Sequence, residues 1–301
     1  MNSPSDGVGA PPLAGGLMSA GRGLVGGMGF DAWFLGLDAP MPKVPPADAA
    51  ASVDLDYLHF TVVLDTRRRL ARITGVNVDG ARLVDVERRD DWRLDERIPA
   101  DWQAGPGVYA RNDLDRGHLV RRRDPVWGPP EVAARANSDT FRDPNAAPQA
   151  SEFNQSMLLW VGLEDHVLEY ARVTAQRLSV FTAPVLAADD PPYRGIRVPL
   201  QFFKIVAWRS GDELAAAGFV LDQSPLVDLE TPARVEAERA RVAVDEVPDL
   251  GPFRTFQVPI ADIAELSGLS MPELIAAERM PRTIAAAGWR EVTEPGQLLL
   301  G

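Results

Sequence analysis

Near its middle the chain carries its most informative motif, Asp115-Arg116-Gly117-His118-Leu119. Three further segments follow within 50 residues: Asn145-Ala146-Ala147-Pro148-Gln149, Phe153-Asn154-Gln155-Ser156 and Leu163-Glu164-Asp165. Together they bring one histidine, several amides and a late carboxylate into a short span of sequence. Such a set supplies a general base, an oxygen ligand for a hard metal ion, and an anchor for the waters of that ion.

These motifs resemble the DNA/RNA non-specific endonucleases, the sugar-non-specific branch of the ββα-metal (His-Me finger) nucleases. That family carries an Asp-Arg-Gly-His motif, then Asn-x-x-Pro-Gln, then an Asn-Gln helix start that ends in Leu-Glu. A chance match to four specified residues occurs on the order of once per 10⁵ positions, so three linked segments in the same order make the resemblance specific. It covers roughly residues 30–278 and is sharpest over residues 92–170.

The resemblance implies an α+β fold, in which a central, largely antiparallel sheet is flanked by helices. A ββα unit would present His118 opposite the helix that begins near Asn154. His118 would then be the general base that activates a water, a role suited to an imidazole near neutral pH. Asn154 would be the direct protein ligand to Mg²⁺, with Mn²⁺ as an alternative ion, and Glu164 would hold the waters of that ion.

The other polar residues of the motifs receive supporting roles from the same resemblance. Asn145 joins the catalytic set, and Gln149 and Arg116 are expected to contact substrate. For Arg116 a structural ion pair is the open alternative. Asp115 is expected to fix the loop that carries His118 rather than to perform chemistry.

Which arginine contacts the scissile phosphate stays open at the level of sequence. In relatives it lies shortly before a residue that corresponds to Trp92, which favours Arg89, with Arg88 as the near alternative. Such an arginine would offset the negative charge that the phosphate gains during hydrolysis. Arg97 is a third candidate, and a surface ion pair is its alternative role.

The spacing of Asn154 and Glu164 departs from some relatives. Glu164 follows Asn154 by ten residues, where those relatives have eight. Ten residues of regular helix turn through roughly 280°, which would not align the two side chains. A bulge, or a position of Asn154 before the regular helix, would bring them together. Relatives with an Asn-Gln-Ser start and a Trp before Leu-Glu resemble the longer spacing, which favours Glu164 over Asp165.

Composition bounds the class of protein. At 301 residues, with 46% hydrophobic and 25% charged residues, the chain can bury one large core or two small ones. Cysteine is absent, which excludes disulfides and thiolate metal ligands. The net charge of −12 is unusual for a nucleic-acid enzyme, because such proteins bind phosphate through a basic face. Positive charge is instead local, at residues 67–69, 88–89 and 121–123.

Residues 1–29 are rich in Gly, Pro, Ala and Ser and predict a flexible leader, which leaves residues 30–301 as a single domain. No Lys or Arg precedes Arg22, and glycines interrupt the apolar residues, so a signal peptide is not indicated. Location therefore stays unknown, with the cytoplasm and export by a non-classical route both open. No apolar run is long enough to span a membrane.

Local patterns predict a sheet before the motif region. Strands are expected over residues 57–64 and 70–78, with a hairpin turn at Asp79-Gly80 and a returning strand over residues 83–86. His59 lies within the first of these strands with no second metal ligand near it in sequence. We therefore expect a packed, hydrogen-bonded histidine rather than a catalytic one.

The remaining predicted elements alternate between helix and strand. A short helix over residues 131–137 and a longer one over roughly 152–174 are expected around the motif segments. Later segments are expected as strands over 178–185, 198–208 and 216–222, and residues 253–259 are expected to lead into helices over 260–266 and 272–280. Residues 226–247 are highly charged, and we expect an exposed excursion there whose role is open.

The function implied by the resemblance is metal-dependent hydrolysis of DNA and RNA by an activated water. Two alternatives stay open: a nuclease-fold toxin or defence effector with a restricted substrate, and an inactive relative that only binds nucleic acid. The presence of both His118 and Asn154 disfavours the inactive relative. Besides DNA and RNA, the partners that stay open are a second copy of the chain, as a homodimer, and an inhibitor or immunity protein.

Overall fold

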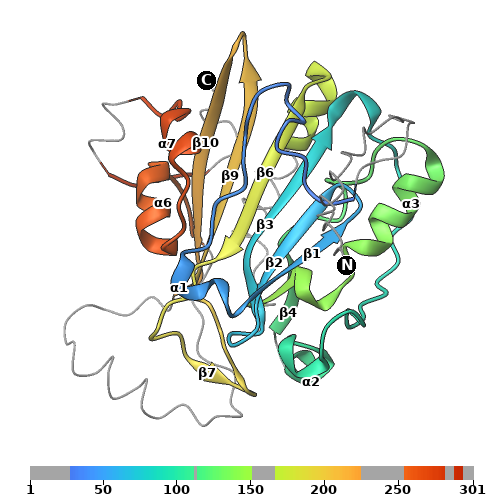
Figure 1. Ribbon diagram of the computed structural model, residues 1–301, viewed down its shortest axis with the longest axis vertical. Coiled ribbons are helices and arrows are strands. Elements are labelled where there is room, and N and C mark those ends of the chain that lie inside the picture. Colours follow the sequence, from blue (N-terminus) through green and yellow to red (C-terminus); the bar gives the residue numbers. More distant parts are fainter. Residues whose placement is uncertain (1–27, 112–113, 151–166, 225–253, 282–287, 294–301) are drawn as a thin grey trace, which may run out of the picture.

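The computed structural model describes residues 28–111, 114–150, 167–224, 254–281 and 288–293. Its main feature is an eight-stranded sheet in the order β1-β2-β3-β6-β9-β10-β11-β12 (Figure 1). Every neighbouring pair is antiparallel, which confirms the predicted α+β class with a largely antiparallel sheet. The strands are β1 Ser52–Tyr57, β2 Phe60–Asp65, β3 Leu70–Asp79, β6 Arg177–Pro184, β9 Gln201–Ser210, β10 Glu213–Asp222, β11 Arg254–Val258 and β12 Arg290–Glu291.

Smaller elements surround this sheet. Two further pairs of strands are β4 Leu114–His118 with β5 Ala146–Ala150, and β7 Pro192–Tyr193 with β8 Ile196–Arg197. The helices are α1 Pro46–Ala49, α2 Pro106–Tyr109, α3 Pro130–Asp139, α6 Ile260–Ser267 and α7 Pro272–Ala276, and residues 167–174 are also helical. Short 3₁₀ turns lie at Gly80–Arg82, Ala100–Trp102 and Asp143–Asn145. In the described part of the chain, no helix has the length and apolar character needed to cross a membrane.

The central strands are buried on both faces, and this explains their continuous apolar sequences. Along β9, Phe202 and Val206 belong to one core cluster, and Phe203 and Ile205 belong to the other. Side chains alternate between the faces of a strand, so one uninterrupted run of apolar residues fills both cores. The predicted strands over residues 178–185, 198–208 and 216–222 are confirmed as β6, β9 and β10, with ends shifted by a few residues.

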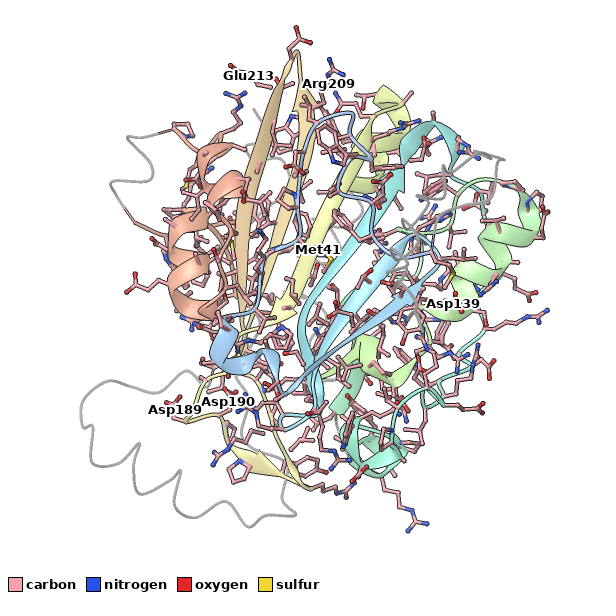
Figure 2. The ribbon with its side chains drawn as sticks, in the orientation of Figure 1. Met41, Asp139, Asp189, Asp190, Arg209 and Glu213 are labelled. Carbon is pink, nitrogen blue, oxygen red and sulfur yellow. The ribbon has the colours of Figure 1, made fainter. Side chains whose placement is uncertain are left out.

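One face of the sheet packs against α6, α7 and the segment formed by residues 30–44. Ile260, Ile263 and Leu274 of the two helices lie in this core, and the helices follow β11 as predicted. The segment 30–44 crosses the sheet, where Met41 lies over its centre (Figure 2). Gly75 leaves room for this crossing, because a Cβ there would lie 2.9 Å from Cγ of Met41.

The opposite face carries β4, β5 and the helical residues 167–174. Leu119, Val120 and Ala147 lie in the same core cluster as Val167, Leu168 and Ala171 of that helix. The candidate functional motif is therefore built on this second face of the sheet. This placement puts the whole thickness of the sheet between the motif and α6 and α7.

Two predicted features of the N-terminal half are wrong. The expected strand over residues 57–64 is a hairpin: β1 ends at Tyr57, β2 begins at Phe60, and these two residues pair. His59 occupies the turn with a φ of 68°. The expected strand over residues 83–86 does not form either, because the chain enters a 3₁₀ turn at Gly80, and Leu83 makes only an isolated bridge to Trp127.

His59 is packed and hydrogen-bonded, as predicted. Its ring stacks on Trp127 at 3.5 Å between centroids, and Nδ1 lies 2.8 Å from the carbonyl oxygen of Pro125. Because a carbonyl only accepts hydrogen bonds, Nδ1 carries the proton. Burial lowers the pKa of His59, so the ring stays neutral in this environment.

Several predicted segments lie outside the described residues. These are residues 1–27, the part of the expected long helix over 152–166, and the charged segment 226–247. The described chain begins at Met28, which forms a β-bridge with Leu58. The predicted division into a leader and one domain stays a prediction.

Candidate active site

β4 and β5 bring two of the sequence motifs into direct contact. The strands are antiparallel, with His118 opposite Ala146 and Asp115 opposite Gln149. The Asp-Arg-Gly-His motif and the Asn-x-x-Pro-Gln segment are thus partner strands of one two-stranded unit, named the finger here. His118 lies at the end of β4, where the chain leaves the finger and enters the core at Leu119.

Gly117 leaves room for the side chain of Gln149. A Cβ on Gly117 would lie 2.1 Å from Cδ of Gln149 and 2.2 Å from its Oε1. Gln149 pairs with Asp115 through its backbone, and its side chain therefore lies over Gly117. Because side chains alternate between the faces of a strand, the Gln149 amide lies on the face of β4 opposite to the His118 side chain.

Asn145 is completely buried, and its amide binds the backbone around His118. Its Oδ1 accepts a hydrogen bond from the backbone N–H of Val120 at 2.8 Å. Its Nδ2 donates to the carbonyl oxygens of Val120 and Thr140 at 2.9 and 3.0 Å. The amide predicted as part of the catalytic set thus lies where it can position the segment after His118.

The His118 ring lies against two aromatic side chains. The centroid of Trp92 is 4.5 Å away, and Phe141 makes an edge contact at 5.0 Å. Nε2 is buried and has no hydrogen-bond partner among the described residues. The site thus holds one ring nitrogen that the described protein leaves unpaired.

Electrostatics keep the His118 ring neutral. Burial is the largest cause and lowers the pKa of His118 to about 3, assisted by the positive charges of Arg88 and Arg122 and opposed by Asp90. At neutral pH the imidazole therefore carries no proton on one of its nitrogens. A neutral imidazole is the protonation state that a general base requires.

Arg88, rather than Arg89, has its charge close to His118. The charge of Arg88 is one of the causes of the lowered pKa of His118. Its side chain is exposed and forms an ion pair with Asp90 at 2.8 Å. Arg89 is exposed as well, and its charge is not among the causes that act on His118. This influence of charge on His118 therefore favours Arg88 over the residue preferred from sequence.

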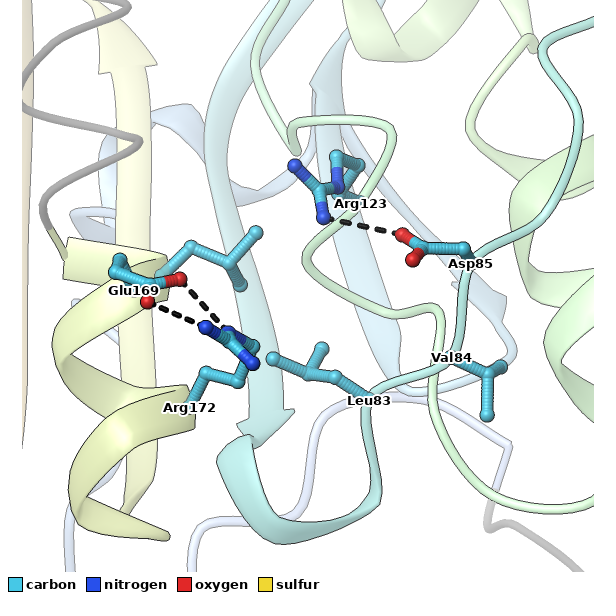
Figure 3. Close-up of a pocket in the computed structure, with 7 residues that line it drawn as sticks. Leu83, Val84, Asp85, Arg123, Glu169 and Arg172 are labelled. Carbon is cyan, nitrogen blue, oxygen red and sulfur yellow. Dashed lines mark hydrogen bonds and ion pairs between the residues drawn. The ribbon is translucent and has the colours of Figure 1, made fainter.

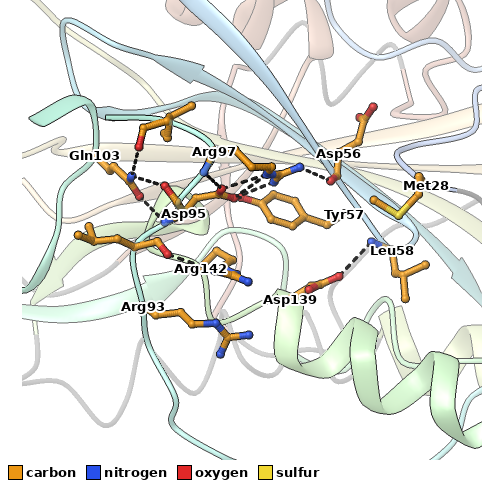
Figure 4. Close-up of polar contacts among 12 residues, drawn as sticks. Met28, Asp56, Tyr57, Leu58, Arg93, Asp95, Arg97, Gln103, Asp139 and Arg142 are labelled. Atoms are coloured by element: carbon orange, nitrogen blue, oxygen red, sulfur yellow. Dashed lines mark hydrogen bonds and ion pairs between the residues drawn. The ribbon is translucent and has the colours of Figure 1, made fainter. Parts of the chain in front are cut away.

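Arg97, the third arginine considered, is engaged in a structural cluster (Figure 4). It binds Asp95 through Nη2 at 2.7 Å, donates to the backbone oxygen of Asp56, and lies over the ring of Tyr57. Burial tends to raise the pKa of Asp95, but hydrogen bonds from Arg97 and Tyr57 outweigh it and hold the value at about 2. Arg97 thus serves a buried carboxylate, in keeping with the ion-pair alternative.

Arg116 points toward a buried acid. Its Nε lies 3.3 Å from Oδ1 of Asp143, and its guanidinium lies over the rings of Tyr109 and Trp92. Burial raises the pKa of Asp143, and the charge of Arg116 opposes that rise. This placement matches the structural ion pair that the sequence left open for Arg116.

Trp92 is a site residue that sequence reasoning used only as a landmark. It packs against both His118 and Arg116, and so forms a wall shared by the two motif residues. The sequence signal that could have identified Trp92 as a site residue was its position just after Arg88 and Arg89, in the segment where the resemblance is sharpest. Asp115, by contrast, is exposed on β4, and partial burial of its carboxyl raises its pKa.

Asn154 and Glu164 lie outside the described residues, so their positions relative to His118 stay predictions. In the part of the chain that is described, no three His or carboxylate side chains gather as a metal cage. A hydrated Mg²⁺ held by one amide needs no such cage. The described residues are thus compatible with the ligand set that the resemblance implies.

Known proteins with similar sequences include nucleases. The sequence is similar to an uncharacterized protein, y4fB, of Sinorhizobium fredii, with 38% identity over 83% of this chain and 40% of that protein. It is also similar to a nuclease of Nostoc sp., with 27% identity over 62% of this chain and 61% of the relative. The chain therefore spans less than two thirds of the length of either protein. Nuclease C1 of Cunninghamella echinulata is 24% identical over 72% of this chain and 81% of its own length.

A solved structure shares the fold. The structure titled "Crystal structure of the EndoG/EndoGI complex: Mechanism of EndoG inhibition" superposes with a TM-score of 0.53 at 20% sequence identity. The match covers 76% of this chain and 87% of that chain. The family model for the DNA/RNA non-specific endonucleases, which are metal-dependent nucleases, matches residues 41–278. With the finger, the aromatic-walled histidine and this match in agreement, the chain belongs to the DNA/RNA non-specific endonuclease family.

Proposed function

We propose that the chain hydrolyses phosphodiester bonds in DNA and RNA, with His118 as the general base and without sequence preference. The observation that carries the proposal is the environment of His118. Its imidazole is kept neutral, lies against Trp92 and Phe141, and has Nε2 unpaired among the described residues. This environment lies on the finger of a chain that belongs to a nuclease family.

In this mechanism His118 removes a proton from the attacking water. The lowered pKa of His118 keeps the imidazole unprotonated across the neutral range, so the base form is always present. Asn145 acts as a positioning residue, because its amide fixes the backbone of Val120 just after the base. The aromatic walls exclude bulk water from one side of the ring, which strengthens electrostatic interactions within the site.

Arg88 is the arginine that we assign to the scissile phosphate. A guanidinium matches the geometry of phosphate oxygens and would offset the charge gained as water adds. Mg²⁺ or Mn²⁺, held by Asn154 with Glu164 in support, would supply charge neutralisation at the leaving oxygen when bound. Of the groups in this mechanism, His118 and Arg88 belong to the part of the chain that the structure describes.

The substrate range follows from what these groups recognise. His118, Arg88 and Asn154 are assigned to water, phosphate and metal, and phosphate contacts carry little sequence information. Because the nucleophile is a water, the reaction needs no 2′-hydroxyl. Both DNA and RNA, single- or double-stranded, should therefore be cleaved, and the products should carry 5′-phosphates as in the family.

The test is cleavage of plasmid DNA and of an unstructured RNA, with Mg²⁺ and with excess chelator. His118→Ala should lower turnover by roughly 10²- to 10⁴-fold, the contribution expected of a general base. Arg209→Gln is the matched control, since Arg209 pairs with Asp212 next to the turn between β9 and β10 and should leave turnover unchanged. Undiminished cleavage by the His118 variant would remove the proposed mechanism.

A protein inhibitor is one partner that this chain could have. The solved structure that shares the fold is the EndoG/EndoGI complex, in which EndoG is inhibited. We therefore propose that an inhibitor of this chain would bind the finger face and protect substrate from cleavage. Homodimer formation is a separate proposal, and the molar mass in solution, measured by light scattering, decides it.

A further inference from the structure

A pocket of about 360 Å³ lies between residues 83–85 and the helical residues 167–174 (Figure 3). Its apolar lining includes Leu83 and Leu168. Its charged lining consists of two arginines and two acids: Arg123, Arg172, Asp85 and Glu169. The helix that forms one wall lies on the same face of the sheet as the finger.

The four charged groups form two exposed ion pairs. Arg123 contacts Asp85 at 3.1 Å, and Arg172 contacts Glu169 at 2.6 Å. The side chain of Asp85 is 93% exposed and that of Arg172 is 59% exposed. Ion pairs in such contact with water contribute little stability and exchange partners easily. Both guanidinium groups are thus available to another anion at small cost.

The pocket is connected to the candidate active site through consecutive residues. Arg122 and Arg123 follow His118 closely along the chain. Arg122 donates a hydrogen bond to the backbone oxygen of Val86 at 2.8 Å, and its charge acts on His118. Arg123 instead contacts Asp85 at the pocket. One arginine that acts on His118 and one that lines the pocket are thus adjacent residues of the same segment.

Positive charge is crowded along this path. Burial lowers the pKa of Arg122, and the neighbouring charges of Arg88, Arg123 and Arg121 lower it further. Like charges held close together raise the energy of the unbound protein, and a bound polyanion relieves that repulsion. Although the net charge of the chain is −12, this local concentration of arginine can attract a polyanion.

We propose that the pocket binds a phosphate of the nucleic-acid strand that lies beyond the phosphate being cleaved, through Arg123 and Arg172. Asp85 and Glu169 occupy these guanidinium groups when no strand is bound and are displaced by the phosphate. Guanidinium groups bind phosphate oxygens through paired hydrogen bonds, and Leu83 and Leu168 offer an apolar surface to the sugar. The inference rests on the proposed function, because it needs a strand bound at His118.

The test uses two pairs of substitutions with opposite expected effects. Arg123→Gln with Arg172→Gln should raise KM for a long DNA by about 10-fold and leave kcat unchanged. Loss of two phosphate contacts should also reduce the slope of log affinity against log salt by roughly 1.8. Asp85→Asn with Glu169→Gln should lower KM several-fold, because the competing carboxylates are neutralised. A dinucleotide substrate, too short to reach the pocket, should be cleaved equally by all variants.

The outcomes separate this inference from the proposed function. Binding of a fluorescent oligonucleotide in chelator, followed by anisotropy, gives a readout that does not depend on cleavage. If the protein cleaves DNA but the arginine variants keep the parent's KM and salt slope, the pocket inference is overturned and the proposed function stands. If no substrate is cleaved, the proposed function fails. The order of the binding affinities of the parent and the variants then still tests whether the pocket binds a phosphate. Weaker binding by the protein with Asp85→Asn and Glu169→Gln would also overturn the pocket inference, and melting curves of each variant check the fold.

Discussion

Asn145→Ala tests whether this amide holds the active-site backbone in place. The substitution removes three hydrogen bonds, one from the N–H of Val120 and two to the carbonyl oxygens of Val120 and Thr140. Each is worth about 1 kcal/mol, and the buried backbone groups left unpaired raise the total loss to about 3–5 kcal/mol. That is a large part of the roughly 5–15 kcal/mol that stabilises a folded protein. The melting temperature should fall by roughly 6–20 °C.

Asn145→Asp sharpens this test, because it keeps the shape of the side chain. One carboxylate oxygen can still accept from the N–H of Val120, but the other now faces two carbonyl oxygens and cannot donate. The aspartate variant should therefore be as unstable as the alanine variant at neutral pH, and should regain stability as its carboxyl is protonated.

Gln149→Ala is the control, since it removes a partly exposed amide from the same finger. Thermal and urea unfolding measure the stabilities, and DNA cleavage below the melting temperature of each variant measures the effect on His118. A melting temperature for Asn145→Ala within about 2 °C of the parent would refute the reasoning.

Three further predictions concern the same site. Gly117→Ala should displace the Gln149 amide, because the new Cβ would lie 2.1 Å from Cδ of Gln149, and adding Gln149→Ala should restore the melting temperature but not the rate of cleavage. The pKa of His118 is lowered to about 3 in the folded protein, whereas an unfolded histidine titrates near 6.5. As the pH falls below 6.5, the unfolded chain protonates His118 before the folded protein does, so folding stability should decrease between pH 6.5 and pH 3. By pH 5 the loss should reach about 2 kcal/mol, and urea unfolding of His118→Phe should lack it. Arg88→Gln should lower kcat/KM by roughly 10²-fold and Arg89→Gln by less than about 10-fold, and equal losses in the cleavage assay would contradict the assignment of Arg88.

The fold was predictable where local sequence and tertiary environment agree. Strands β6, β9 and β10 are buried on both faces, so their apolar runs survive in the sequence as a clear signal. The hairpin between β1 and β2 left no such signal. Its turn consists of Leu58 and His59 rather than the Asn-Gly or Asp-Gly pairs that mark tight hairpins. Histidine tolerates the left-handed conformation better than most residues, which is visible only once φ is known.

Gly80 misled the prediction for a related reason. Asp79-Gly80 matches a hairpin turn, but a Cβ on Gly80 would lie 2.0 Å from the backbone oxygen of Ala171. The glycine is needed for close approach of a distant helix rather than for a turn. A contact between segments so far apart in sequence cannot be inferred from the residues that surround the glycine.

At the candidate site, sequence identified the two motifs, but it identified neither their pairing as strands β4 and β5 nor the direction in which each side chain points. The motifs carry the family resemblance, and β4 and β5 do pair through them. Whether the Asn145 amide faces a substrate or a backbone depends on the path of residues 118–120 and 140–145, which no local pattern encodes. The choice between Arg88 and Arg89 likewise depends on a loop geometry that spacing to Trp92 does not fix.

Substitutions on the two faces of the eight-stranded sheet should have different effects. Ile263 and Leu274 help to fill a core on the side away from the finger, whereas Leu119 and Ala147 help to fill the core beneath it. A cavity opened on the α6–α7 side would weaken folding while the geometry around His118 survives behind the strands. A cavity opened beneath the finger would shift the base itself. The sheet face on which a core substitution lies should therefore predict whether it lowers the stability of the protein or the rate of catalysis.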